Sequence, residues 1–507
     1  MNIAGLRIHT RRGGDLRRTF VACCLALLCT SVRADDGRYL ELVTPDFTVV
    51  SGETEARTRE LAVQVGTFRA AVEQSFGVKL TPAIPLRIYA LDAQDWERYA
   101  QPRAGVAGYF VAQPFSSDLI FDATDTSGGA HELMFHEYVH YILRTFWAGE
   151  VPAFLDEGLA EVLSTARFDK RAVRIAPRHD HIRFLRRNEW LPFERLLAVK
   201  RHDPEYLDHA LAPAFYAQSW ATVYYAMAVN PAFGERMTAY VRELNAGGSR
   251  VKAAEQLIGA VSAEANRDIA TYIRKRRALP ATSLPVVPPA SLEQARVRPL
   301  STEEAELALG ELMLRIADRP RKAQVRFEKV LERSPDSARA RVGRAWSLLL
   351  SGDRSGAASG FDAVNRTAGD LDVPTRVALA RGLFQVAAAE SQESDHPTPV
   401  NRERLAAARR FFGSALDDET NRLEAVNGFV LTCLALEDYP DGLVELAQDA
   451  YRVAPRSSVL AVALALLHEL AGEKTAARRY WEEAARSSHT EPMRARVRQA
   501  LEESSAD

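Results

Sequence analysis

The spacing of apolar residues along the chain predicts a mixed α/β half followed by a helical half. Residues 54–77 carry apolar side chains at helical spacing and end in Gly77, which predicts a helix. From about residue 130 onward the spacing is again helical. Four short runs rich in β-branched and aromatic residues predict strands, at 47–52, 86–91, 108–112 and 118–123.

A proline-rich segment separates the two halves. Residues 280–299 contain five prolines, and proline favours extended backbone that cannot continue a helix. We therefore expect an extended linker at 280–300 between a domain at 38–279 and a second region at 301–490. A C-terminal tail is expected at 491–507.

A small–large–small pattern recurs in the second half. The sets are Ala323/Phe327/Val330 and, 34 residues later, Ala357/Phe361/Val364; Ala408/Phe412/Ala415; and Leu443/Ala447/Ala450 and, 34 residues later, Ala477/Trp481/Ala484. The pattern resembles the second helix of tetratricopeptide (TPR) repeats, which implies an all-α, TPR-like solenoid over 301–490. A plain helical bundle is the alternative, but a constant period favours stacked helix pairs.

Composition and charge narrow the possible functions. At 507 residues the chain is too long for one core, which suggests two or three domains. A hydrophobic content of 47% and a charged content of 26% are ordinary for a globular protein. The formal net charge of −2 provides no basic patch, so we expect no nucleic-acid partner.

The first 34 residues are typical of a secretory signal peptide. Several arginines precede the apolar run FVACCLALLC at 20–29, and Val32 and Ala34 fit the small-residue positions before a cleavage site. The run is shorter than the ~20 residues that span a bilayer, although a retained membrane anchor is the alternative. Cleavage would shift the net charge from −2 to about −7 and leave no stable membrane span. The expected location is the periplasm of a bacterium or the medium outside it.

The stretch HEYVH at 136–140 is the strongest candidate for chemistry. His136 and His140 are four residues apart, so on a helix their Cβ atoms lie about 5–6 Å apart on one face and both rings can reach one ion. Glu137 points to a different side, where its carboxylate can reach a water. His131 is a rival partner for His136, but five residues of spacing put the two on different faces.

A third metal ligand is available in VPAFLDEGLAEVL at 151–163. Pro152 suits the start of a helix, and Glu157 and Glu161 then share one face. Gly158 permits close approach of another helix. Two helices could therefore bring Glu157 to the two histidines, and Glu161 could accept a hydrogen bond from a ligand histidine.

HEYVH together with DEGLAEV resembles the gluzincin branch of zinc metallopeptidases, and most closely the bacterial secreted peptidase-MA-like proteins that often carry TPR units. The resemblance covers about 38–280 and implies an α+β zincin-like domain. It implies Zn²⁺ bound by His136, His140 and Glu157, with Glu161 orienting a ligand. The Gly-x-Met-Glu-Asn segment of the aminopeptidases in this group is absent, so aminopeptidase activity is not implied.

The resemblance implies hydrolysis of peptide bonds by a zinc-activated water, with Glu137 moving the proton. Tyr216 is the candidate that stabilises the oxyanion, with Tyr206 and His209 as less favoured alternatives; Tyr216 could instead pack with Tyr224 and Tyr225. A strand at 108–112 or 118–123 could pair with an extended substrate, or be an ordinary sheet edge.

The sequence therefore predicts a secreted zinc metallopeptidase whose substrate is a peptide or protein. The TPR-like region could bind a protein partner. The alternative function is an inactive or non-enzymatic TPR scaffold of the cell envelope.

Overall fold

The computed structural model describes most of the chain from residue 38 to residue 506. The gaps in this description are 81–83, 101–107, 125–128, 148–150, 170, 246–252, 255–260, 277, 290–291, 293–294, 317–318, 368, 392–397 and 488–490. The expected signal peptide at 1–34 lies outside the described residues. No described helix is both long enough and apolar enough to cross a membrane.

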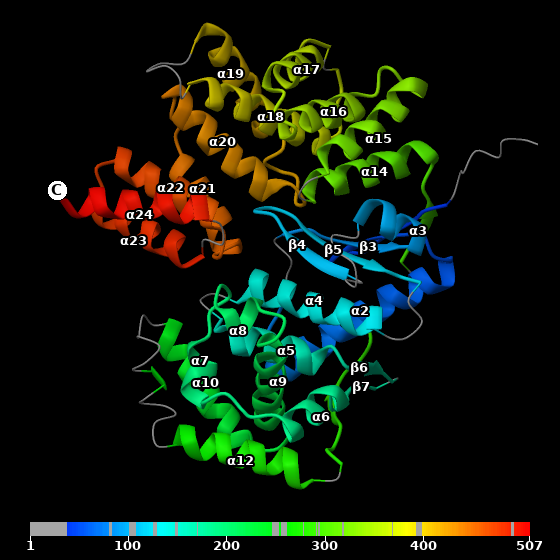
Figure 1. The fold of residues 1–507 in the computed structure, drawn as a ribbon. Coiled ribbons are helices and arrows are strands. Elements are labelled where there is room, and N and C mark those ends of the chain that lie inside the picture. The colour runs from blue at the N-terminus through cyan, green and yellow to red at the C-terminus, as the bar shows by residue number, and fades with distance from the viewer. Residues whose placement is uncertain are drawn as a thin grey trace, which may run out of the picture.

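A six-stranded mixed sheet forms the centre of the first half (Figure 1). Its strands, in spatial order, are β4 (Gly108–Ala112), β5 (Ser117–Asp122), β3 (Leu86–Leu91), β2 (Thr48–Ser51), β1 (Leu40–Val43) and β9 (Val297–Pro299). β2, β3 and β5 run parallel, whereas β4 is antiparallel to β5 at one edge. The four strands expected from the sequence are confirmed.

Helices cover both faces of this sheet. Residues Ile88 and Ala90 of β3 join the core formed with α2 (Glu55–Phe76) and α4 (Gly129–Phe146). Tyr89 and Leu91, on the opposite face, pack with helices of the second half. Because both faces are buried, the run LRIYAL is apolar on both sides instead of alternating with polar residues.

The helix expected at 54–77 is confirmed. Thr54 caps its N-terminus by accepting a hydrogen bond from the backbone N–H of Arg57, and Gly77 ends it with a left-handed φ of 62°. A short helix α3 (Ala93–Asp95) and a π-helical turn at Trp96–Ala100 follow β3.

A second lobe lies beneath α4 in Figure 1. It contains a three-stranded antiparallel sheet of β6 (Ala166–Phe168), β7 (Ala172–Ile175) and β8 (Thr282–Pro285). The helices of this lobe are α5 (Ala153–Leu163), α6 (His179–Arg187), α7 (Phe193–Ala198), α8 (Pro204–Leu207), α9 (Ala212–Ala228), α10 (Pro231–Asn245) and α12 (Val261–Lys275).

The segment expected as a linker, 280–300, is extended but is not a free spacer. It contributes β8 to the small sheet and β9 to the edge of the large one. Between them Leu292 is buried beside Gly66 of α2, where a Cβ would meet the leucine at 2.1 Å. Pro285 and Pro299 sit at the ends of edge strands, where a missing N–H is tolerated.

The second half is an array of antiparallel helix pairs, which confirms the prediction of helical repeats (Figure 1). The helices are α14 (Thr302–Arg315), α15 (Pro320–Arg333), α16 (Ala338–Leu350), α17 (Arg354–Thr367), α18 (Val373–Ser391), α19 (Pro399–Gly413), α20 (Arg422–Leu436), α21 (Leu443–Val453), α22 (Ser458–Leu470), α23 (Lys474–Ser487) and α24 (Glu491–Ala506). The segment expected as a tail is therefore the helix α24, and its Val497 is buried.

The recurring small–large–small residues lie on α15, α17, α19, α21 and α23, except Ala415, which follows the end of α19, and all of them are buried. Glycines on the alternate helices make room for the large residue. A Cβ on Gly343 would lie 2.3 Å from the ring of Phe327, and one on Gly428 would lie 2.3 Å from the ring of Phe412. These glycines explain why helices that carry bulky aromatics still pack closely.

The helical array contacts the first half at both of its ends. At the α14 end, Arg315 donates to Asp118 of β5 at 2.5 Å and to the hydroxyl of Tyr89 at 2.9 Å. At the other end, Ile84 and Phe115 pack against the core of α20–α24. The array therefore arches over the sheet and returns to the first half (Figure 1).

Candidate metal centre

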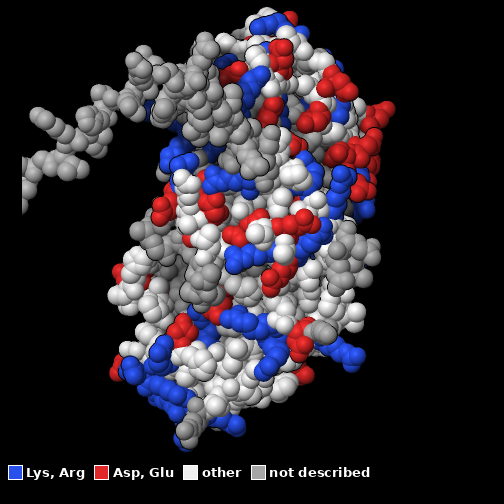
Figure 2. Space-filling model, turned by 90° about the vertical axis from the view of Figure 1, so that its right-hand side faces the viewer, with Lys and Arg blue, Asp and Glu red and all other residues white. Residues whose placement is uncertain are grey.

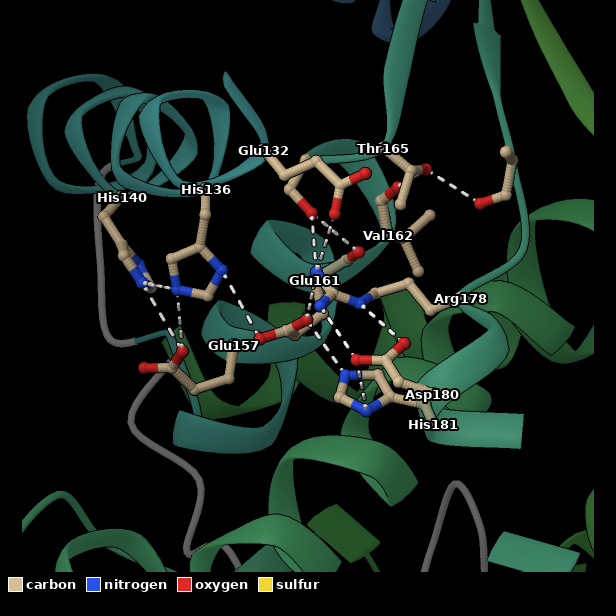
Figure 3. A network of polar contacts seen from close by, with 12 residues as sticks. Glu132, His136, His140, Glu157, Glu161, Val162, Thr165, Arg178, Asp180 and His181 are labelled. Atoms are coloured by element: carbon tan, nitrogen blue, oxygen red, sulfur yellow. Dashed lines mark hydrogen bonds and ion pairs between the residues drawn. The ribbon is translucent and has the colours of Figure 1, made fainter. Parts of the chain in front are cut away.

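Three of the side chains singled out in the sequence meet between α4 and α5. The Nε2 atoms of His136 and His140 lie 3.1 Å apart. Oε2 of Glu157 lies 3.4 Å from the first and 3.5 Å from the second. Figure 3 shows both imidazoles pointing from α4 toward the Glu157 carboxylate.

This triangle of donor atoms fits a tetrahedral ion. Two ligands bound at about 2.0–2.2 Å to a tetrahedral Zn²⁺ are about 3.3 Å apart. Glu157 is buried, and its Oε2 has no hydrogen-bond partner. A buried carboxylate oxygen without a partner is costly unless it binds something, so the donor set can hold a metal ion.

Gly158 lets α5 pack tightly against α9. A Cβ at this position would lie 2.5 Å from Cγ2 of Val223 and 2.6 Å from the carbonyl oxygen of Ser219. The close approach of a helix expected at Gly158 is thereby confirmed, and it fixes the position of the neighbouring Glu157.

Each histidine has a carboxylate behind it. Nδ1 of His140 lies 2.8 Å from Oδ1 of Asp156, and Nδ1 of His136 lies 3.5 Å from Oε1 of Glu161. The sequence reasoning included Glu161 but missed Asp156, although it directly precedes Glu157 in DEGLAEV. Such carboxylates set which ring nitrogen carries the proton and which is free to bind a metal.

Further groups hold Glu161 in place (Figure 3). Its Oε2 lies 2.9 Å from Nε2 of His181 and 3.0 Å from Nη1 of Arg178. His181 belongs to the HDH stretch at 179–181, which begins α6.

The buried charges shift several pKa values. Burial alone would lower the pKa of His140, but Asp156 and Glu157 outweigh it and raise the pKa to about 10. Burial alone would raise the pKa of Glu157, but its interactions with the nearby His136 and His140 lower it to about 2. Because metal ligands must be deprotonated, a metal ion that binds these groups must displace the protons that they hold.

Two tyrosines border the cluster. The hydroxyl of Tyr206, on α8, donates to Oε1 of Glu157. The Tyr216 ring, on α9, lies 5.9 Å from the Tyr206 ring, and burial followed by the charge of Glu157 raises the pKa of both phenols. Tyr216 does not pack with Tyr224 or Tyr225, whose described ring contacts are to other side chains.

The other residues singled out in the sequence, Glu137, His131 and His209, lie outside the triangle of donor atoms. Glu137 is half-buried on α4, and no described residue forms a hydrogen bond or ion pair with its carboxylate. The His131 ring packs 4.8 Å from Phe135 and takes no part in the cluster. His209 is exposed.

Charges of both signs are interspersed on the face shown in Figure 2, with a basic group at the lower end, where α12 lies in Figure 1. The expectation of no nucleic-acid partner stays a prediction.

Comparisons with known proteins bear on the helical fold. No protein-family model matches the chain, and no curated protein matches it significantly. Among solved structures, it is similar to PilF of Pseudomonas aeruginosa, with 18% identity over 40% of this chain and 87% of that one and a TM-score of 0.29. TTC0263, a TPR protein of Thermus thermophilus, matches with 18% identity over 39% and 98%, at a TM-score of 0.30.

The human IFIT1 dimer solved with m7Gppp-AAAA matches with 16% identity over 73% of each chain, at a TM-score of 0.30. All three TM-scores are below 0.5, so these likenesses do not indicate a function for the chain.

Proposed function

We propose that this chain is a zinc-dependent metallopeptidase of the gluzincin type, with a zincin-like first half. The observation that carries the proposal is the buried triangle of His136 Nε2, His140 Nε2 and Glu157 Oε2, with sides of 3.1, 3.4 and 3.5 Å. Two neutral nitrogens and one carboxylate oxygen are a donor set that zinc enzymes use, leaving a fourth position for water or substrate.

The residues around the triangle supply proton transfer and orientation. A zinc ion held there supplies Lewis-acid chemistry, since it polarises a carbonyl group and lowers the pKa of water. Glu137 follows His136 directly on α4, and its uncommitted carboxylate takes a proton from the attacking water and passes it to the leaving amine. Asp156 and Glu161 keep the two imidazoles in the orientation that points Nε2 at Glu157.

The phenols of Tyr216 and Tyr206 have different roles in the proposed reaction. Tyr206 is committed to Glu157 through its hydrogen bond, so it orients that ligand. Tyr216 lies next to Tyr206, and the charges of Glu157, Glu161 and Glu137 act on its phenol, which supports a role for its hydroxyl at the reacting atoms. Its raised pKa keeps the proton available for donation to the developing oxyanion.

The substrate is a peptide or protein bound in extended form. In the order of the described strands, β4 is the outer strand of the large sheet, and it packs against α4. An outer strand can pair with an extended peptide and hold it beside α4, the helix that carries His136 and His140. The location we propose is the periplasm or the medium outside a bacterium.

A scaffold that binds a protein partner through its helical repeats is the second candidate. The observation that favours it is the helical array itself, which is also all that the solved structures named above share with the chain. In this case the metal cluster would be structural.

Metal content and proteolysis together separate the two functions. The wild-type chain should carry about one zinc ion and cleave members of a random peptide library. Glu157→Ala should lose zinc, whereas Glu137→Gln should retain zinc and lose cleavage. Glu60→Gln, a change on the surface of α2, is the matched control and should behave as wild type. A wild-type chain without metal would overturn the proposal, and metal without cleavage would favour the scaffold.

A further inference from the structure

Three arginines, Arg144, Arg201 and Arg456, interact electrostatically with Asp156, the carboxylate behind His140. Arg144 lies on α4, and Arg201 lies in the turn between α7 and α8 and donates to Oδ2 of Asp156. Arg456 comes from the turn before α22 in the helical array, and its Nη1 donates to the carbonyl oxygen of Leu143 at 2.9 Å. Arg456 therefore connects the helical array to α4, the helix that carries His136 and His140.

Among the side chains that the structure describes, positive charge is in excess around Asp156. Asp156 carries the negative charge and already interacts with His140 as well as Arg201. Neither Arg144 nor Arg456 forms an ion pair with any carboxylate of the described residues. Burial, followed by repulsion from Arg201 and Arg144, outweighs the attraction of Asp156 and lowers the pKa of Arg456 to about 10.

Capping of α4 does not account for this excess. The C-terminal end of a helix favours a nearby cation, and Arg456 already donates to the carbonyl group of Leu143 there. Arg144 and Arg456 are partly buried and Arg201 is exposed on one side, and bringing these like charges together is unfavourable unless an anion joins them.

The excess charge lies along the path of the proposed substrate. Arg144 is four residues beyond His140, so it lies on the metal-binding face of α4, about 6 Å further along the helix axis. Its guanidinium lies 5.5 Å from the centre of the Phe110 ring on β4, the outer strand. An extended peptide advances about 3.3 Å per residue, so this distance corresponds to about two residues from the bond beside the metal.

We propose that Arg144, Arg201 and Arg456 form a subsite for a carboxylate of the substrate, so that the enzyme prefers peptides with an acidic group about two residues from the scissile bond. The location relative to that bond rests on the proposed function. Guanidinium groups suit this ligand because their paired N–H donors match the two oxygens of a carboxylate. The carboxylate belongs either to an Asp or Glu side chain or to the C-terminus of the peptide.

Binding and cleavage are tested with the full-length chain loaded with zinc. Fluorescent peptides are made in matched sets that carry Asp or Asn at each of three positions on either side of a cleaved bond. Each peptide is made with a free and an amidated C-terminus. Dissociation constants are measured by anisotropy on the Glu137→Gln variant, and kcat/KM is measured on the otherwise wild-type chain.

A peptide with the preferred carboxylate should bind on the order of tenfold more tightly than the matched peptide in which an amide (Asn or an amidated C-terminus) replaces that carboxylate. This is the difference that one charge-assisted hydrogen bond predicts. Arg456→Gln keeps a donor for Leu143, and it should reduce this preference to less than about threefold with its zinc content unchanged. Arg452→Gln is the control. It removes an exposed arginine that pairs with Asp449 on α21, and it should keep the full preference.

Equal binding of acid and amide by the wild-type chain would overturn the subsite, as would a full preference in Arg456→Gln. A preference confined to the free C-terminus identifies the α-carboxylate as the ligand, and one confined to an internal position identifies an acidic side chain. Arg456-dependent binding of acids without any cleavage would support the subsite and reject the peptidase. Cleavage without any preference for acidic peptides would support the peptidase and reject the subsite.

Discussion

Oδ1 of Asp156 lies 2.8 Å from Nδ1 of His140, and this contact leaves Nε2 of the same ring facing His136 and Glu157. Asp156 therefore decides which nitrogen of His140 is available to a metal ion. Asp156 also accepts a hydrogen bond from Arg201 and attracts Arg456, two arginines of the proposed carboxylate subsite. One residue thus connects the proposed metal site with the proposed subsite.

Replacing Asp156 by Asn should weaken zinc binding by about 10- to 100-fold, because the amide can still accept a hydrogen bond but lacks the charge that makes His140 a better ligand. Competition with a chromophoric chelator measures the affinity. Asp336→Asn, an isosteric change at an exposed position of the helical array, is the control and should have no effect. An unchanged affinity in Asp156→Asn would show that the 2.8 Å contact does not tune the site.

Removing the metal should lower the thermal stability of the wild-type chain. A ligand present at about 1,000 times its Kd stabilises the native state by about 4 kcal/mol, so a chelator should lower Tm by several degrees. Glu157→Ala should show no such shift, because it has lost the third ligand. Differential scanning calorimetry with and without chelator tests this. An equal shift in both proteins would mean that the chelator acts elsewhere.

The two tyrosines should differ in their effects. Tyr216→Phe removes the hydroxyl that we propose stabilises the oxyanion, so kcat should fall by about 10²- to 10³-fold with zinc retained. Tyr206→Phe removes the hydrogen bond to Glu157, so it should chiefly weaken zinc binding. Steady-state kinetics together with metal titration distinguish the two. If Tyr206→Phe lowers kcat and leaves zinc affinity intact, the roles are exchanged.

Gly343→Ala should destabilise the helical array. Alanine is normally better than glycine in a helix by about 1 kcal/mol. Here its Cβ would lie 2.3 Å from the fully buried Phe327 ring, and overpacking of this kind costs about 1–3 kcal/mol. Urea unfolding measures the change. Gly413→Ala, whose Cβ would meet Phe429 at an ordinary 3.4 Å, should be neutral or stabilising. Equal stability of the two variants would contradict the packing argument.

His131 should make the protein sensitive to acid. Burial against Phe135 and Phe168 and repulsion from Arg167 lower its pKa to about 4, whereas in the unfolded chain it takes up a proton near pH 6.5. The unfolded state therefore binds more protons between these values, and stability should fall as the pH drops from about 6.5 to 4. His131→Phe should flatten this part of the pH profile of unfolding free energy. The exposed His202→Asn should leave it unchanged.

Local periodicity alone determined several features of this protein. Because a helix repeats every 3.6 residues, the four-residue spacing of His136 and His140 was sufficient to predict that both rings reach one point. Four strands and the helix at 54–77 followed from the same kind of pattern, and so did the buried small–large–small sets of the array. The expectation that the first half is helical from about residue 130 was wrong at β6 and β7. Glu157 could be proposed because it lies on the next helix along the chain.

Only the tertiary structure decided which distant segments meet. Helical spacing alone does not distinguish Asp156 from a surface aspartate. Its role follows from the contacts of its carboxylate with His140 and Arg201, which the fold brings to it. The segment at 280–300 has the composition of a spacer, yet its strands complete two sheets because each sheet had an unpaired edge. Arg456 reaches the carbonyl group of Leu143 across 313 positions of sequence, a contact set by the curvature of the whole array. Side-chain periodicity reports which face of an element is buried, whereas the partner of that face depends on how all the elements pack together.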